Sequence, residues 1–139
     1  MNSKLMMTLG AAGLLLAAVS PLSAHHSFSA EFDSQKPVKL EGTVNRMEWS
    51  NPHTWLYIDV KNAEGKVETW AVEGGAPGVL LRNGSTRKSL PEGTKIVVNG
   101  FAAKDGSLRA NSRSIEFPDG RKLDTGSSYT GGKEKEGGK

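Results

Sequence analysis

Apolar and polar side chains alternate between residues 54 and 61, and this alternation constrains the fold more than any other feature of the chain. One set is Thr54, Leu56, Ile58 and Val60, and the other is Trp55, Tyr57, Asp59 and Lys61. Because successive side chains of a β-strand point to opposite faces of the sheet, a period of two predicts a half-buried strand. Such a strand needs partner strands that cover its apolar face.

Further segments show strand patterns separated by turn sequences. The expected strands are 38–49, 54–61, 67–72, 94–103 and 108–117, and a short segment at 121–123 follows them. In the first of these, the apolar positions change phase near Asn45 and Arg46, which indicates a bulge in a long strand that pairs on both sides. Residues 79–82 precede Asn83-Gly84 and predict one short helix between the third and fourth strands.

This order of elements predicts an all-β fold. We expect a small barrel of five or six strands, similar to the oligonucleotide/oligosaccharide-binding (OB) fold, with one short helix between strands three and four. An open roll with the same strand count buries the same alternate residues and remains an alternative. The chain contains no cysteine. Apolar burial and backbone pairing must therefore hold the domain together without disulfides.

The beginning of the chain has the layout of a signal peptide, which we expect at 1–24. Lys4 precedes an uncharged stretch from Leu5 to Val19, and small residues follow it up to Ala24. The apolar stretch is shorter than the roughly 20 residues that a membrane-spanning helix needs. We therefore expect cleavage after Ala24, a mature chain that starts at His25, location in the periplasm and no stable membrane anchor after cleavage.

Beyond the signal peptide, we expect an N-terminal arm at 25–37, the barrel domain at 38–124 and a disordered polar tail at 125–139. The chain has 18 Lys and Arg against 15 Asp and Glu, and the two signs alternate along most segments. A nucleic-acid-binding surface would require clustered cations. Charge and expected location therefore argue against nucleic acid as a partner.

Several short motifs together resemble a known family. They are His25-His26-Ser27-Phe28, Glu31-Phe32-Asp33, Glu48-Trp49-Ser50-Asn51-Pro52-His53-Thr54-Trp55, Leu80-Leu81-Arg82 and Pro118-Asp119-Gly120-Arg121-Lys122. This set resembles a family of small periplasmic bacterial proteins that is catalogued as a domain of unknown function. The resemblance extends from His25 to about Asp124. It implies export and a barrel-like fold, and it implies no activity.

The three histidines of the chain form a candidate metal site. His25 as a first residue offers both its α-amine and its imidazole, and His53 follows the Asn51-Pro52 turn. Nitrogen donors in a T-shaped or square-planar set favour Cu(II), so Cu(II) is the candidate cofactor, and His26 can replace either partner. Two alternatives stay open: a solvated N-terminus, and a His53 that caps a turn.

Four aromatic side chains form a second candidate site, a ligand-binding face made of Trp49, Trp55, Tyr57 and Trp70. Flat rings on the outer face of strands two and three of such a barrel can stack on bases or sugars. Cross-strand aromatic pairs also stabilise ordinary sheets, and this structural interpretation is the favoured one. Phe28 and Phe32, four residues apart, are expected to share one face of a helical turn and to anchor the N-terminal arm.

No residue pattern indicates a catalytic site. We expect the strand carboxylates Glu48, Asp59, Glu68 and Glu73 to lie on a solvated face of the sheet. We expect a non-enzymatic, exported binding module with an unknown periplasmic protein or small ligand as its partner, and with a candidate Cu(II) site. The rival hypothesis is a metal-independent domain that binds protein, envelope or glycan through Trp55 and Tyr57. A copper-dependent redox enzyme is a third hypothesis.

Overall fold

The computed structural model describes residues 28–126 and 128. Its elements are α1 (Phe28–Glu31), β1 (Phe32–Glu48), β2 (Trp55–Lys61), β3 (Val67–Glu73), α2 (Pro77–Arg82), β4 (Lys95–Ala103), β5 (Arg109–Glu116) and β6 (Lys122–Asp124). The expected signal peptide and both His25 and His26 lie outside the described residues. No helix in the described part is long and apolar enough to cross a membrane.

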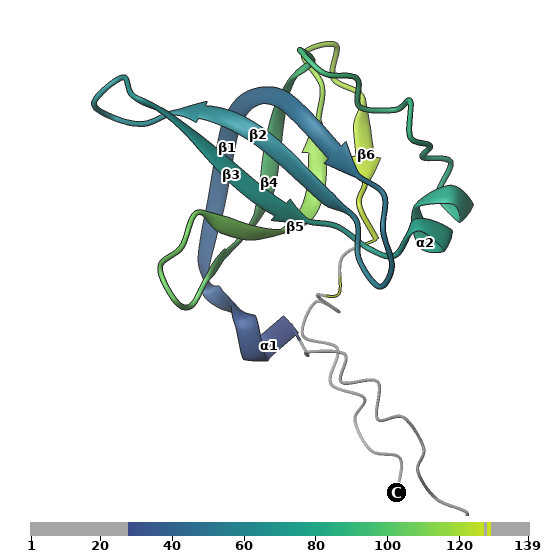
Figure 1. Ribbon diagram of the computed structural model, residues 1–139, viewed down its shortest axis with the longest axis horizontal. Helices are drawn as coiled ribbons and strands as arrows, with labels where there is room; N and C mark the ends of the chain where they lie inside the picture. The colour runs from purple at the N-terminus through teal and green to yellow at the C-terminus, as the bar shows by residue number, and fades with distance from the viewer. Residues whose placement is uncertain (1–27, 127, 129–139) are drawn as a thin grey trace, which may run out of the picture.

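The strands form a closed, barrel-like ring (Figure 1). Their order is β3-β2-β1-β4-β5-β6, and a further pairing between β3 and β5 joins the two sides of the sheet. Neighbouring strands are antiparallel, whereas β3 and β5 run parallel. The predicted all-β fold is confirmed, and α2 is the short helix predicted between the third and fourth strands.

The long first strand pairs on both of its sides, as its bulge predicts. β1 is antiparallel to β2 and to β4, and its register with β2 shifts between Val44 and Arg46. The phase change in the sequence near Asn45 marks this shift. The strand also begins earlier than expected, at Phe32, so residues 32–37 of the expected N-terminal arm belong to β1. Their polar sequence has no alternation that could indicate a strand.

The core lies inside the ring and is built from the alternate apolar residues of each strand. Its most deeply buried members are Ile58, Val72, Val98, Ala110 and Ile115. Ile58 faces Trp70 across the β2–β3 pair, and Val98 faces Ile115 across the β4–β5 pair. Burying one isoleucine or valine side chain stabilises the fold by about 1.5–3 kcal/mol relative to leaving it exposed. Burial of this kind stabilises the domain without disulfides.

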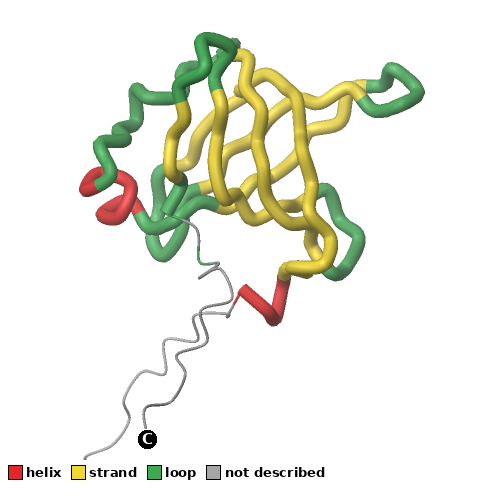
Figure 2. The backbone as a smooth tube through the Cα atoms, turned by 180° about the vertical axis from the view of Figure 1, so that it is seen from behind, coloured by secondary structure: helices red, strands yellow, loops and turns green. Residues whose placement is uncertain are grey.

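The short helix α1 precedes β1 at one end of the strand ring (Figure 2), and aromatic contacts anchor it there. The Phe28 ring stacks on Phe32 with centroids 5.8 Å apart and meets the edge of Phe101 at 5.6 Å. The backbone N–H of Lys104 also donates to the Glu31 carbonyl, at 2.9 Å. These contacts confirm that Phe28 and Phe32 share one face and fix the arm to β4.

The chain remains packed beyond the point at which a disordered tail was expected. Thr125 is buried, and its hydroxyl donates to the Ser112 carbonyl at 2.9 Å. The Ser128 hydroxyl lies 3.1 Å from Nδ2 of Asn111. The expectation of a disordered tail from residue 125 is therefore wrong for Thr125 and Ser128. Hydrogen bonds of backbone and hydroxyl groups hold this polar segment, although it has few apolar side chains to bury. Residues 129–139 lie outside the described part.

Candidate functional site

A buried carboxylate next to a histidine is the most distinctive polar feature of the described residues. Glu73, at the end of β3, is only 4% exposed, although its sequence context predicts a solvated position. His53 Nδ1 lies 3.2 Å from its Oε1, and the His53 side chain is 23% exposed. The expectation of a solvated Glu73 is therefore wrong: contacts with residues distant in sequence cover it.

Asn111 on β5 covers Glu73 from the other side. The two residues are register partners in the parallel β3–β5 pair, and Asn111 is 0% exposed. Its Nδ2 donates to Glu73 Oε1 at 3.3 Å and to the Ser128 hydroxyl at 3.1 Å. Glu73 therefore has polar partners on two sides, as a buried carboxylate requires.

The backbone around His53 is held by the glycines that follow β3. Gly74 N–H donates to the Thr54 carbonyl at 2.9 Å, and Thr54 N–H and hydroxyl each donate to the Gly75 carbonyl at 3.0 Å. Gly75 N–H donates to the Thr125 carbonyl at 2.7 Å. A side chain at Gly75 would collide with the Gly126 carbonyl. The Gly74-Gly75 turn thus connects the start of β2 to the end of β6 and sets the position of His53.

The charges around this pair extend to the N-terminal helix. Arg109 Nη2 lies 2.6 Å from Glu31 Oε2, and its guanidinium lies 5.4 Å from the Trp55 ring centroid. Burial raises the pKa of the Glu73 carboxyl above its ordinary value, and the Glu31 carboxylate acts in the same direction. His53, Arg109 and the hydrogen bond from Asn111 oppose this rise in the pKa of Glu73. We refer to His53, Glu73, Asn111, Arg109 and Glu31 as the His53 cluster.

The four expected aromatic residues do not share one face. Trp55 and Tyr57 lie on the outer face of β2, where Arg46 covers the Tyr57 ring at 3.6 Å from its centroid. Trp70 is opposite Ile58 and packs against the core. The expected grouping of Trp70 with Trp55 and Tyr57 is therefore wrong, because the two sets point to opposite sides of the sheet.

Trp49 lies apart from the other three aromatic residues. It follows the end of β1 and lines a hollow together with Leu81, Thr86, Arg87 and Lys88. The Arg87 guanidinium lies 5.8 Å from the Trp49 ring centroid and donates to the Trp49 carbonyl at 3.4 Å. Trp49 therefore belongs to the surface around α2, not to a platform on β2 and β3.

A wider hollow of about 780 Å³ lies away from the His53 cluster, between β1, β4 and the end of β5. Apolar atoms of Val67, Ile96 and Phe117 contribute to its wall. Its charged residues include both Asp59 and Lys95, so it has no preferred sign of charge. Its mixed charges indicate no ligand class.

Metal ligation within residues 28–126 and 128 alone is not indicated, because no group of three or more His, Asp or Glu side chains there could hold an ion. His53 supplies one imidazole. The other two expected ligands, His25 and His26, lie outside the described residues. A site through His53 therefore needs donors from the segment before Phe28.

The described residues define a small, barrel-like all-β domain that carries a buried carboxylate, Glu73, next to a partly exposed histidine, His53. The family model described as "Family of unknown function (DUF6152)" matches residues 12–112, and the chain belongs to this family. The matched range includes all three histidines and Glu73. Comparisons with curated proteins and with solved structures give no match. Family membership confirms the resemblance to a domain of unknown function and assigns no activity.

Proposed function

We propose that the protein is an exported metal-binding module in which His53 and the N-terminal residues His25 and His26 bind one Cu(II) ion. The observation that carries this proposal is the 3.2 Å contact between His53 Nδ1 and the buried Glu73 carboxylate. Histidines that ligate metals almost always donate their second ring N–H to a carboxylate, a carbonyl or water. His53 has such a partner.

The contact with Glu73 determines which atom of His53 is the ligand. A neutral imidazole that carries its proton on Nδ1, next to Glu73, has its lone pair on Nε2, on the far side of the ring. Because the carboxylate is held by Asn111, it fixes the orientation of the ring as well as its tautomer. His53 is therefore preorganised to present Nε2 to an ion.

The contacts of helix α1 with the strand ring support a supply of the remaining donors from the N-terminal arm. Phe28 is anchored on Phe101, and Glu31 is bonded to Arg109, a member of the same cluster. Glu31 also acts on the pKa of Glu73, which reflects the proximity of the two carboxyl groups. The chain from His25 to Phe28 spans at most about 10 Å. A mature N-terminus at His25 would therefore start within this distance of Phe28, and the proposal requires that it reach His53.

The donor set favours copper over the alkaline-earth ions. An α-amine and two or three imidazoles are nitrogen ligands, which suit Cu(II), whereas Mg²⁺ and Ca²⁺ prefer oxygen. Glu73 acts through His53 instead of binding the metal. The proposed role is Cu(II) binding and not catalysis. A copper-dependent redox enzyme would turn over a substrate, whereas a binding module would not.

The rival role, stacking of a ligand on Trp55 and Tyr57, gains no support from the surroundings of these rings. A guanidinium lies close to each ring, Arg46 at 3.6 Å from the Tyr57 centroid and Arg109 at 5.4 Å from the Trp55 centroid. A base or sugar stacked on the same side would have to displace an arginine. We therefore favour the metal-binding role.

A calorimetric Cu(II) titration tests the proposal. The protein is recovered from the periplasm of the expression host, with His25 verified as the first residue by mass spectrometry, and is compared with a form that carries one extra residue before His25. We expect one ion to bind per chain, with a large loss of affinity in the extended form and in His53→Gln. Equal affinity in all three proteins would overturn the proposal, and recovery of a chain that still carries residues 1–24 would overturn the export that it assumes.

A further inference from the structure

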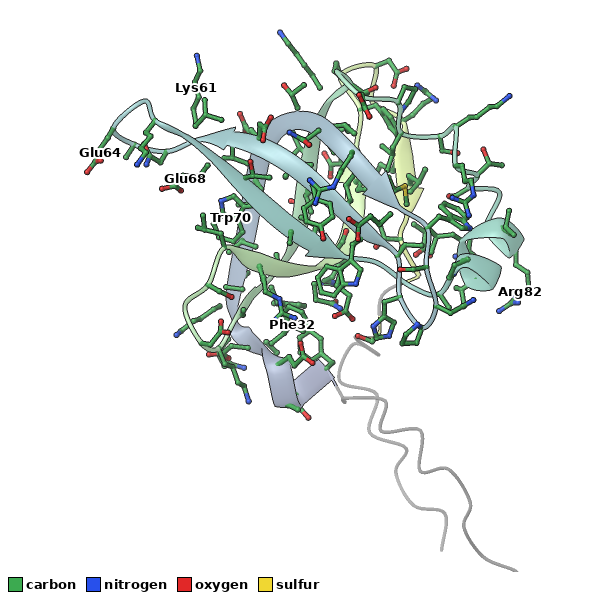
Figure 3. All side chains as sticks on the ribbon, in the orientation of Figure 1. Phe32, Lys61, Glu64, Glu68, Trp70 and Arg82 are labelled. Carbon is green, nitrogen blue, oxygen red and sulfur yellow. The ribbon has the colours of Figure 1, made fainter. Side chains whose placement is uncertain are left out.

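The surface around α2 carries a second, separate combination of apolar and cationic groups. Trp49, Leu81, Thr86, Arg87 and Lys88 line a hollow of about 440 Å³. Leu81 is 55% exposed, which makes it one of the most exposed large apolar side chains of the described part. Arg82 follows it in the last turn of α2 and points away from the ring (Figure 3). We call Trp49, Leu81, Arg82, Arg87 and Lys88 the α2 patch.

The charge of this region has a single sign. Residues 74–91 contain Arg82, Arg87 and Lys88 and no Asp or Glu at all. The nearest acidic residue before Trp49 is Glu48, which is bonded to Arg46 at 3.3 Å. This differs from the rest of the chain, in which basic and acidic residues alternate. The α2 patch therefore presents a positive field that an anionic partner would complement.

The position of the patch suits a flat partner. α2 and the loop after it project from the side of the strand ring (Figure 1), and Arg82 is at the outer edge of the molecule (Figure 3). The patch has no free strand edge to which a peptide could add, because α2 and residues 86–88 are not part of the sheet. A protruding leucine next to a tryptophan and several cations is typical of a membrane-interface surface.

We propose that the α2 patch binds the surface of anionic phospholipid membranes. Leu81 and the edge of Trp49 insert between the headgroups, while Arg82, Arg87 and Lys88 contact lipid phosphates. This association is peripheral and reversible, because one leucine and one tryptophan bury far less apolar area than a spanning helix. It uses none of the residues of the His53 cluster, and it requires no metal.

Vesicle co-flotation tests the inference. The periplasmic protein that begins at His25 is mixed with vesicles of equal parts phosphatidylglycerol and phosphatidylcholine, and with vesicles of phosphatidylcholine alone, in the presence of a chelator. We expect flotation only with the anionic vesicles, and less of it as the salt concentration rises. Each cation contributes about a fivefold change in partitioning, so Arg87→Glu/Lys88→Glu should weaken flotation at least tenfold. Leu81→Asp should also weaken it.

The matched controls lie on the opposite part of the molecule. Val67 is 54% exposed, like Leu81, so Val67→Asp adds the same charge to an equally exposed apolar position. Lys36→Glu/Lys39→Glu reverses two exposed cations on β1. Both controls should float nearly as well as the parent.

Absence of flotation of the parent protein, or equal losses in the controls and in the patch variants, would overturn the inference. Binding to poly-glutamate with the same variant dependence, but not to vesicles, would overturn it in favour of an acidic protein partner.

Discussion

Arg109 joins β5 to the N-terminal helix: its Nη2 lies 2.6 Å from Oε2 of Glu31, and its guanidinium lies 5.8 Å from the centroid of Phe32. Through this pair, a strand of the ring fixes the segment that leads to His25. The bond is partly exposed, at 34% for Arg109 and 30% for Glu31, so its value for stability is about 1 kcal/mol or less. Its larger effect should be on where the arm lies.

Breaking this pair should therefore weaken metal binding more than it lowers stability. In Glu31→Gln, we expect severalfold weaker Cu(II) affinity by calorimetry and a nearly unchanged midpoint of unfolding, because the aromatic contacts of Phe28 remain. The control is Lys36→Gln, which breaks an exposed pair 4.0 Å long with Asp33 and should leave both quantities unchanged. The same affinity in Glu31→Gln and in the parent would show that the pair does not position the metal ligands.

The second prediction concerns the support that Glu73 gives to His53. Glu73→Ala leaves the buried Asn111 amide without one acceptor, and we expect a loss of about 1–3 kcal/mol in the free energy of unfolding. Glu73→Gln keeps an acceptor oxygen and should recover most of this stability. Urea denaturation measures the free energies, and nitrogen-edited NMR of the imidazole reports the tautomer of His53. A protonated Nε2 in the metal-free parent protein would contradict the proposed ligand atom.

A third prediction tests the glycine turn behind His53. In Gly75→Ala, the added methyl group would collide with the Gly126 carbonyl, so the chain must shift away from the hydrogen bond between Gly75 N–H and Thr125. We expect a destabilisation of about 1–3 kcal/mol, typical of forced repacking. Gly78→Ala is the control, because its new methyl group would meet only the end of Arg82 and would favour helix α2. Thermal unfolding of both variants distinguishes a collision from a general effect of alanine.

The fourth prediction is a dependence of stability on pH that arises from Asp59. Hydrogen bonds from the side chains of Asn45 and then Thr69 hold the pKa of Asp59 below its ordinary value. Because the pKa is lower in the folded state, the ionised Asp59 stabilises the fold. This contribution is present above about pH 4, the pKa of aspartate in an unfolded chain, and it is lost as the pH falls through the pKa of the folded state. Asn45→Ala should reduce the loss of stability between pH 5 and 2, measured by urea denaturation. An unchanged slope would assign the acid sensitivity to other groups.

Much of the fold could be predicted because it follows from local patterns. Alternation at 54–61 predicts β2, the phase change near Asn45 predicts the bulge of β1, and Asn83-Gly84 marks the end of α2. The early start of β1 could not be predicted, since residues 33–36 are polar and the strand reaches beyond them only because Phe32 pairs with Ala103 on β4. The expected arm boundary was therefore too late.

The site was harder to predict than the fold. His53 could be singled out as one of only three histidines, but its partner Glu73 is a single carboxylate among several on the strands. What makes Glu73 distinctive is its contact with Asn111, which lies 38 residues away in sequence and meets it only through the parallel pairing of β3 and β5. A pair formed by ring closure leaves no periodic signal in the sequence. The apolar and glycine neighbours of Glu73, Val72 and Gly74, were the only local indication that it is buried.

The β3–β5 pairing that closes the ring consists of only three register pairs, Ala71 with Arg109, Val72 with Ala110 and Glu73 with Asn111. Folded proteins open locally as well as globally, and native-state hydrogen exchange measures the free energy of each opening. Opening this pairing would also separate Glu73 from Asn111 and release the ring of His53. An ion bound through His53 should therefore slow amide exchange along β3 and β5, so that the exchange rates of these two strands report whether the site is occupied.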